Sequence, residues 1–274
     1  MTGELPKLVL KKDEKTAVEV YLHGATVTSW KCKGKEMLFV SKNAVFNGVK
    51  AIRGGIPVVF PNFGPWELGP QHGFARTETW KIHQQPEKDE SGNIVAALVL
   101  EDTEQTRKIW DYNFKFLYTL TLKDDEFSTE VSIENTGTKG FHFTTLVHTY
   151  YNVDISKMKL RGLHGCEYID KVGGGEKKEE REALQISGNV DSVYKNTANE
   201  LLLSTGDHEI RITKENLPDT VVWNPWIEKA KQMSDFGDTE YKNMVCVEPG
   251  YVAKPYDLRP AEVFKAKQTI TCLC

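Results

Sequence analysis

The chain has 274 residues, and its 35 basic and 39 acidic residues give a net charge of -4. The basic residues are scattered, so they form no electrostatic footprint for nucleic acid. No run approaches the ~20 apolar residues that span a membrane, and the first residues lack the apolar core of a signal peptide. We therefore expect a cytoplasmic protein that binds neither nucleic acid nor membranes.

The cysteines are odd in number and far apart: Cys32, Cys166, Cys246, Cys272 and Cys274. They form no Cys-x-x-Cys motif and no Cys/His cluster with the spacing of a zinc site. This pattern indicates reduced intracellular thiols and predicts neither a disulfide framework nor a metal site.

The first half of the chain shows the alternation of short strands. Residues 8–40 read as strand, turn, strand, and residues 78–85 and 93–102 read as neighbouring strands joined by a charged turn. Residues 114–153 alternate apolar and polar side chains around turns at 123–125 and 135–137. They predict three long strands paired with one another.

The second half continues the same pattern. Residues 173–180 form a charged, glycine-rich stretch that predicts a solvated hairpin or loop, and a short helix is predicted only over residues 229–244, with Asp235 and Asp238 as caps. Residues 264–274 end the chain with clean strand alternation. No linker divides the sequence, so we expect a single domain, 1–274, of the all-β class: a large antiparallel β-sandwich with very little helix.

Residues 53–76 stand apart because five glycines and four prolines exclude a regular helix there. Arg53 and Arg76 flank this stretch, and Gln71 and His72 add further donors. Two guanidinium groups beside one rigid segment suit a phosphate, so the segment suggests a binding loop for an anionic, hydroxylated ligand. The alternative is that both arginines are ordinary surface charges.

Two ionisable residues lie inside apolar strands. Alternation places His148 on one face with His142, Thr144, Leu146 and Tyr150, a polar face that suits the lining of a cleft. Glu248 follows a nearly continuous apolar strand and precedes Pro249-Gly250. Carboxylates are rarely buried unless they are paired or functional. A half-buried structural histidine and a glutamate bonded to its own turn are the alternatives.

Several motifs occur in one order along nearly the whole chain: RGGIP at 53–57, QHGFAR at 71–76, His148, Asp191 in NVDSVYK, VVWNPW at 221–226 and CVEPG at 246–250. In this order the sequence resembles the hexose-6-phosphate mutarotases of the aldose 1-epimerase family. One departure is Asp111 after Trp110, where many relatives have proline. It lies outside the motifs and affects local loop shape alone.

The resemblance implies a galactose-mutarotase-like β-sandwich and an isomerase that interconverts the α and β anomers of a hexose 6-phosphate, without a cofactor and as a monomer. It assigns His148 and Glu248 as the catalytic pair, and Arg53, Gln71, Arg76 and Asp191 as substrate contacts. The chemistry needs one base and one acid. Glu248 as carboxylate would accept the anomeric hydroxyl proton, and His148 as imidazolium would donate to the ring oxygen.

Two other functions remain open at this stage. A glycoside hydrolase would need two carboxylates, for which Asp191 could join Glu248. A non-catalytic sugar-phosphate sensor would keep the arginines without needing His148 and Glu248 together. The sequence does not rank glucose, galactose and mannose 6-phosphates as substrates.

Overall fold

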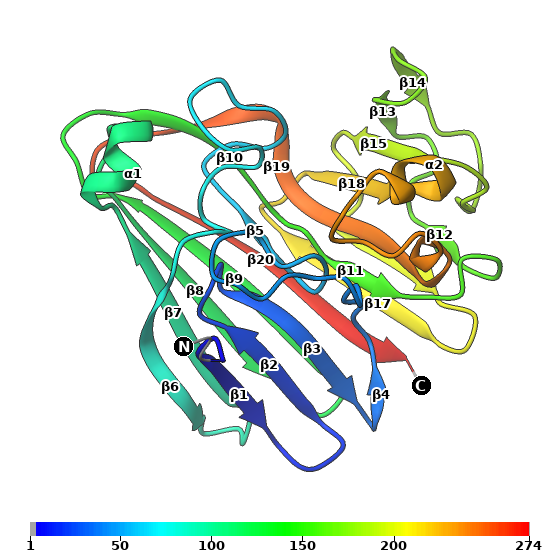
Figure 1. Ribbon diagram of the computed structural model, residues 1–274, viewed down its shortest axis with the longest axis horizontal. Coiled ribbons are helices and arrows are strands. Elements are labelled where there is room, and N and C mark those ends of the chain that lie inside the picture. The colour runs from blue at the N-terminus through cyan, green and yellow to red at the C-terminus, as the bar shows by residue number, and fades with distance from the viewer. Residues whose placement is uncertain (1–3, 274) are drawn as a thin grey trace.

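The computed structural model describes residues 4–273. Its strands form three antiparallel sheets, and Figure 1 shows the blue N-terminal sheet in front of the long sheet that runs from teal to red. The small sheet has four strands in sequence order: β1 (Lys7–Lys11), β2 (Ala17–Tyr21), β3 (Thr26–Cys32) and β4 (Lys35–Glu36). These match the strands predicted over residues 8–40.

The second sheet carries the candidate site. Its strand order is β14-β13-β15-β18-β19-β10-β5, with β11 pairing to β19. Its strands are β5 (Val58–Val59), β10 (Phe141–Val147), β11 (Tyr150–Asn152), β13 (Glu167–Asp170), β14 (Glu176–Lys178), β15 (Val190–Tyr194), β18 (Asp219–Asn224) and β19 (Met244–Leu258). The predicted charged hairpin is β14 with its turn, and all three residues of β14 are exposed.

The third sheet is a continuous ladder with the order β12-β16-β17-β20-β9-β8-β7-β6. Its strands are β6 (Lys81–Lys88), β7 (Ile94–Glu101), β8 (Phe114–Leu122), β9 (Glu126–Asn135), β12 (Lys159–Arg161), β16 (Glu200–Ser204), β17 (Glu209–Glu215) and β20 (Val263–Leu273). Alternate residues of β8 and β20 are buried, as their sequence pattern predicts.

One hydrophobic core joins the three sheets. It contains Trp30 of β3, Phe116 of β8 and Phe143 of β10, together with more than forty other buried side chains. Phe60 lies at its centre, with five aromatic rings within 6.2 Å of its own. Phe60 thus anchors the glycine- and proline-rich segment to the core, and the residues that follow it reach the surface.

The prediction of three paired strands over residues 114–153 is wrong for the third strand. β8 and β9 pair with each other, but β10 lies in the second sheet, between β19 and β5. The turn after β9 therefore crosses from one sheet to the other. At this turn the Asn135 side chain donates to the carbonyls of Lys139 and Leu258, and the second of these bonds ties the chain to the end of β19. Alternation shows which side chains are buried, but not which sheet a strand joins.

The predicted helix over residues 229–244 is also wrong in its bounds. The segment begins inside α2 (Trp226–Lys231) and contains the 3₁₀ helix η1 (Glu240–Asn243), and neither helix has a side-chain cap. Asp235 pairs with Arg53 instead of capping a helix. A further helix that the sequence did not predict, α1 (Glu104–Ile109), begins with a capping box between Thr103 and Thr106.

Candidate active site

The site lies where β10 ends and β11 begins, beside the middle of β19. The chain leaves the strand conformation between β10 and β11, at His148 and Thr149. Their backbone groups are hydrogen-bonded to neighbouring segments: His148 N donates to Pro57 O at 2.9 Å, and Val247 N donates to Thr149 O at 3.2 Å. Val221 of β18 is opposite Glu248 in the adjacent ladder. Glu248 is therefore fixed by a regular strand and His148 by the hydrogen-bonded break beside it, while β5 brings the glycine- and proline-rich segment to the same place.

A cavity of about 220 Å³ opens at this point. It brings together six of the seven residues singled out from the sequence, with several that were not. Its lining consists of Arg53, Phe63, Gly64, Pro65, Gln71, His72, His148, Tyr150, Lys171, Asp191, Val221, Trp223 and Glu248. The seventh, Arg76, lies behind this lining and donates from Nη2 to Gln71 O at 2.7 Å.

His148 and Glu248 form a close, buried pair. His148 Nδ1 lies 3.4 Å from Glu248 Oε1, and the two residues are 7% and 1% exposed. Within residues 4–273, neither His148 Nδ1 nor Glu248 Oε2 has a hydrogen-bond partner. Two polar atoms buried without partners are costly for a protein to keep, which points to a ligand that supplies the missing bonds.

The His148 ring is held by aromatic neighbours. It stacks on Tyr150 with 4.8 Å between centroids and an interplanar angle of 11°, and the rings of Trp223 and His72 meet it edge-on. The imidazole thus has one fixed plane, with its Nδ1 directed to the carboxyl group.

Burial shifts the pKa values of the pair in opposite directions. Burial, with the nearby charge of Asp191, raises the pKa of Glu248 well above its usual value. Burial, with the positive charges of Arg76 and Arg53, lowers the pKa of His148 well below its usual value. Both shifts favour a protonated carboxyl group beside a neutral imidazole, which opposes the imidazolium assigned to His148 from the sequence.

The loop at residues 60–73 fixes the tautomer of His72. The Gly64 N–H donates to His72 Nδ1 at 3.2 Å, and burial, with the charges of Arg76 and Lys171, lowers the pKa of His72 to about 3. The neutral ring must then carry its hydrogen on Nε2, as a donor. Gly73 is needed here, because its φ is +72° and a Cβ would lie 2.2 Å from Phe60 O.

The cations around the cavity differ in how they are held. Arg53 donates to Tyr150 Oη at 3.2 Å and pairs with Asp235 at 3.2 Å; burial lowers its pKa, but these two neighbours raise it by more. Burial lowers the pKa of Arg76 to about 10, although the nearby Tyr150 side chain favours the charged form of the guanidinium group. Lys171 is exposed, with Nζ 4.1 Å from the centre of the Phe63 ring.

The sequence did not single out Lys171, Trp223 or Asp235 as site residues. Lys171 enters the cavity because its N–H bonds to Asp191 O, and Trp223 because β18 places it opposite Asp191. Lys229 adds an ion pair with Asp191 at 3.7 Å. Each of these contacts depends on strand pairing, which the sequence pattern does not specify. Tyr150 was placed correctly, on the same face as His148.

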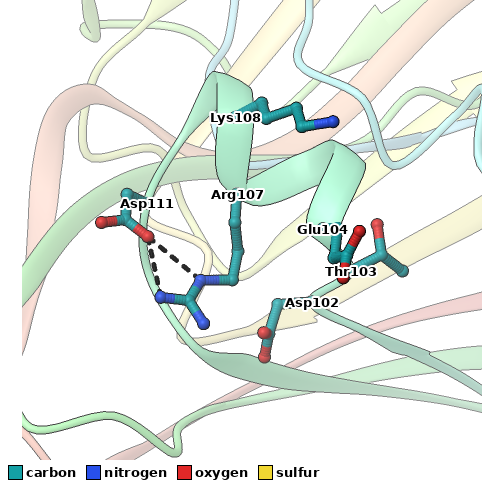
Figure 2. Close-up of a pocket in the computed structure, with 6 residues that line it drawn as sticks. All are labelled: Asp102, Thr103, Glu104, Arg107, Lys108 and Asp111. Atoms are coloured by element: carbon teal, nitrogen blue, oxygen red, sulfur yellow. Dashed lines mark hydrogen bonds and ion pairs between the residues drawn. The ribbon is translucent and has the colours of Figure 1, made fainter.

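A second, more open depression of about 470 Å³ lies beside α1 and is shown in Figure 2. Its charged side chains are exposed or half-buried. Arg107 Nε and Nη2 donate to Asp111 Oδ1 at 3.0 and 2.9 Å, and Asp102 accepts from Asn113 Nδ2 and Phe114 N. Thr103 serves the helix cap. No pair of buried ionisable groups faces it, so the cavity at His148 and Glu248 is the better candidate for chemistry.

The sequence matches the aldose 1-epimerase family over residues 6–271. The chain belongs to the aldose 1-epimerase family. A curated relative from Cenchrus ciliaris, provisionally named glucose-6-phosphate 1-epimerase, is 40% identical over 98% of this chain and 85% of its own length.

Solved structures agree with the aldose 1-epimerase assignment. A crystal structure titled as a provisional mutarotase from Salmonella typhimurium has a TM-score of 0.86 and 30% identity, covering 95% of this chain and 88% of its own. The galactose 1-epimerase of Lactobacillus acidophilus, at 18% identity, shares the fold with a TM-score of 0.74 over 96% and 93% of the two chains. The predicted family, the galactose-mutarotase-like β fold and the isomerase class are confirmed. Within residues 4–273, no helix is long and apolar enough to cross a membrane.

Proposed function

We propose that this aldose 1-epimerase interconverts the α and β anomers of a hexose 6-phosphate, with glucose 6-phosphate as the main substrate. The observation that carries the proposal is the buried pair of His148 and Glu248 in the wall of a cavity that Arg53 and Lys171 also line. Among the described residues, His148 Nδ1 and Glu248 Oε2 have no hydrogen-bond partner. The provisional name of the Cenchrus ciliaris relative supports the choice of sugar phosphate.

Mutarotation moves two protons. The ring oxygen must gain one while the anomeric hydroxyl loses one, so that the ring opens to the aldehyde, the C1–C2 bond rotates and the ring closes on the other face. One partner of the pair donates and the other accepts, and closure returns both protons, so the pair needs a single proton between its two members. Each positioned transfer contributes about 10²–10⁴-fold.

The pair can hold its proton on either side. With the proton on Glu248, as burial favours in the empty cavity, Glu248 is the acid and His148 the base. With the proton on His148, as assigned from the sequence, the roles exchange. The 3.4 Å separation lets the proton pass between them as the substrate's hydroxyls replace the missing partners.

The remaining side chains divide between the phosphate and the hydroxyl groups. We assign two arginines to the phosphate: Arg53 in the lining, and Arg76, which lies outside the lining and holds the Gln71 carbonyl. Exposed Lys171 adds a third cation at the mouth of the cavity. Gln71, His72 and Asp191 face the sugar, where His72 Nε2 is a donor and Asp191 an acceptor. Arg53 is already paired with Asp235, whereas Arg76 and Lys171 have no ion pair among the described residues, so a phosphate dianion would balance these two charges and a neutral sugar would not.

A non-catalytic sensor gives no reason for the buried acid and base, which cost stability without contributing to binding charge. A glycoside hydrolase would use Asp191 as its second carboxylate, but Asp191 is paired with Lys229. We also propose that residues 1–274 form one domain, because one large hydrophobic core joins the three sheets, and that the protein acts as a monomer.

The test is exchange spectroscopy by NMR on the anomeric protons of glucose 6-phosphate and of glucose. Purified protein should accelerate exchange of the phosphorylated sugar far more than that of glucose. Exchange of glucose 6-phosphate at the buffer rate would refute the proposed function.

A further inference from the structure

Three potential metal ligands meet beneath the cavity. His148, Cys246 and Glu248 each offer one ligand atom, and these atoms lie within 4.8 Å of one another. Spacing along the chain did not indicate this group, because His148 comes from a segment about a hundred residues before the other two. Cys246 has no part in the proton transfers described above.

The sheet directs Cys246 towards the cavity. In β19, Cys246 and Glu248 are two residues apart and so project from the same face. Cys246 is paired across the ladders with Tyr150 of β11 and Trp223 of β18, and both of these line the cavity. Side chains paired in this way share one face of the sheet, so the Cys246 thiol lies between two cavity-lining rings and one step from the carboxyl group.

The ligand atoms are available and chemically suited to zinc. His148 Nδ1 and Glu248 Oε2 have no hydrogen-bond partner within the described residues, and both side chains are more than nine-tenths buried. The 3.4 Å between His148 Nδ1 and Glu248 Oε1 is close to the separation of two ligands in a tetrahedron with metal bonds of ~2.0–2.1 Å. Sulfur, imidazole and carboxylate together favour zinc over magnesium or calcium.

We propose that His148, Cys246 and Glu248 form an inhibitory site for zinc or a chemically similar divalent cation. Binding would replace the thiol and carboxyl protons with bonds to the metal, and the two anionic ligands would balance its charge. Water or a sugar hydroxyl from the cavity could occupy a fourth position. A metal held there would block both proton-transfer groups, so zinc and substrate would compete.

A direct binding experiment does not depend on the proposed function. Co²⁺ alone is added to a Cys166→Ala/Cys274→Ala background, which removes the partly exposed thiol and the terminal one. A thiolate-to-cobalt charge-transfer band in the near ultraviolet should form at one equivalent and disappear with EDTA. The same titration with Cys246→Ala in this background should give no such band. No band in the background protein, or an unchanged band after Cys246→Ala, would overturn the site.

The inhibition experiment uses chelator-treated protein and buffered free Zn²⁺. Zinc should slow anomer exchange of glucose 6-phosphate, and Cys246→Ala should raise the half-inhibitory zinc concentration at least about ten-fold, as expected for loss of a metal ligand. Mg²⁺ should not inhibit, because it prefers oxygen ligands. Equal zinc sensitivity of the Cys246→Ala variant would contradict the proposal.

Two controls separate the possible failures. Cys246→Ser keeps the volume of the side chain and should lose the sulfur band even if the alanine variant does not fold. If the protein lacked anomerase activity, the proposed function would fail while the cobalt spectrum still decided the metal site.

Discussion

Glu248 and Glu240 are both buried carboxylates, yet their surroundings differ in kind. Glu240, in η1, is 7% exposed and accepts from Ser41 Oγ at 2.6 Å, from Lys42 N at 3.0 Å and from Gly237 N at 2.9 Å. Burial alone would raise the pKa of Glu240, but these donors lower it overall. Glu248 is 1% exposed, its Oε2 has no partner among the described residues, and its pKa is raised.

The contrast shows what distinguishes a structural carboxylate from a chemical one. Burial is common to both, so it is not diagnostic. Satisfied hydrogen bonds hold Glu240 in one ionised state and fasten the segment after β4 to η1. The incomplete hydrogen bonding of Glu248 leaves its proton free to move and its oxygen free to meet a substrate.

The largest expected effect comes from replacing each carboxyl group with an amide. Glu248→Gln should lower the anomer exchange rate for glucose 6-phosphate by about 10²–10⁴-fold, because an amide cannot exchange the proton. It should leave stability nearly unchanged, since the oxygen has few bonds to lose. Glu240→Gln should cost about 1–3 kcal/mol in urea unfolding while retaining the rate per folded molecule, because an amide nitrogen cannot accept from the donors. Similar losses of activity in both folded variants would remove the distinction.

A second prediction extends the comparison to the arginines. Arg76→Ala should lower kcat/KM for glucose 6-phosphate by about ten- to a hundred-fold, the effect of losing one or more charge-assisted bonds. The low rate on glucose should change little, and Arg76→Lys should rescue only partly because an ammonium group lacks the planar fork. NMR exchange on both sugars gives the ratio. An equal fall on the two sugars would mean that Arg76 supports the Gln71 loop alone.

The pH profile sharpens the contrast in proton affinity. Because the pKa of His148 is lowered and that of Glu248 raised, the pair should hold one proton over a broad range around neutrality, where kcat/KM stays level. At high pH Glu248 loses the shared proton, and the pair has no acid. At low pH the pair gains a second proton, on His148, and has no base. The rate should fall up to about ten-fold per pH unit on either side.

The substrate phosphate titrates near pH ~6, so its ionisation must be followed by phosphorus NMR and its effect separated from that of the pair. A midpoint close to that of free histidine would contradict the assignment.

The smallest effect is expected at the mouth of the cavity. Lys171 is exposed, so Lys171→Ala should lower kcat/KM for glucose 6-phosphate by only about two- to five-fold, consistent with a surface charge contribution below ~1 kcal/mol. The loss should shrink as salt screens the charge. Lys229→Ala is the matched control, since Lys229 is already paired with Asp191. A salt-independent loss in the Lys171 variant would indicate a packing role against Phe63 instead.

Much of the fold could be read from the sequence because it depends on local pattern. The alternation in β8, β9 and β20 identified strands and their buried faces, and His148 and Glu248 stood out as ionisable residues in apolar strands. The sheet to which β10 belongs could not be read, because β10 pairs with a strand more than a hundred residues later.

The ion-pair partners of the site residues could not be predicted from the sequence either. Asp235 looked like a helix cap in the sequence, but in the structure it neutralises Arg53, 182 positions earlier. Proton affinity also depends on such distant contacts, so the sequence could single out His148 and Glu248 but not the direction in which their pKa values are shifted.

Glu248 lies within β19, paired with Val221 of β18 on one side and facing the break between β10 and β11 on the other, whereas Lys171 and the residues of the 60–73 loop belong to connections. In amide hydrogen exchange the two sets should therefore separate, with the peptide around Glu248 opening only on global unfolding and the loop peptides exchanging through local fluctuations. Loop sequences could then change, and with them the preferred sugar, without loosening the strand that carries the proton chemistry.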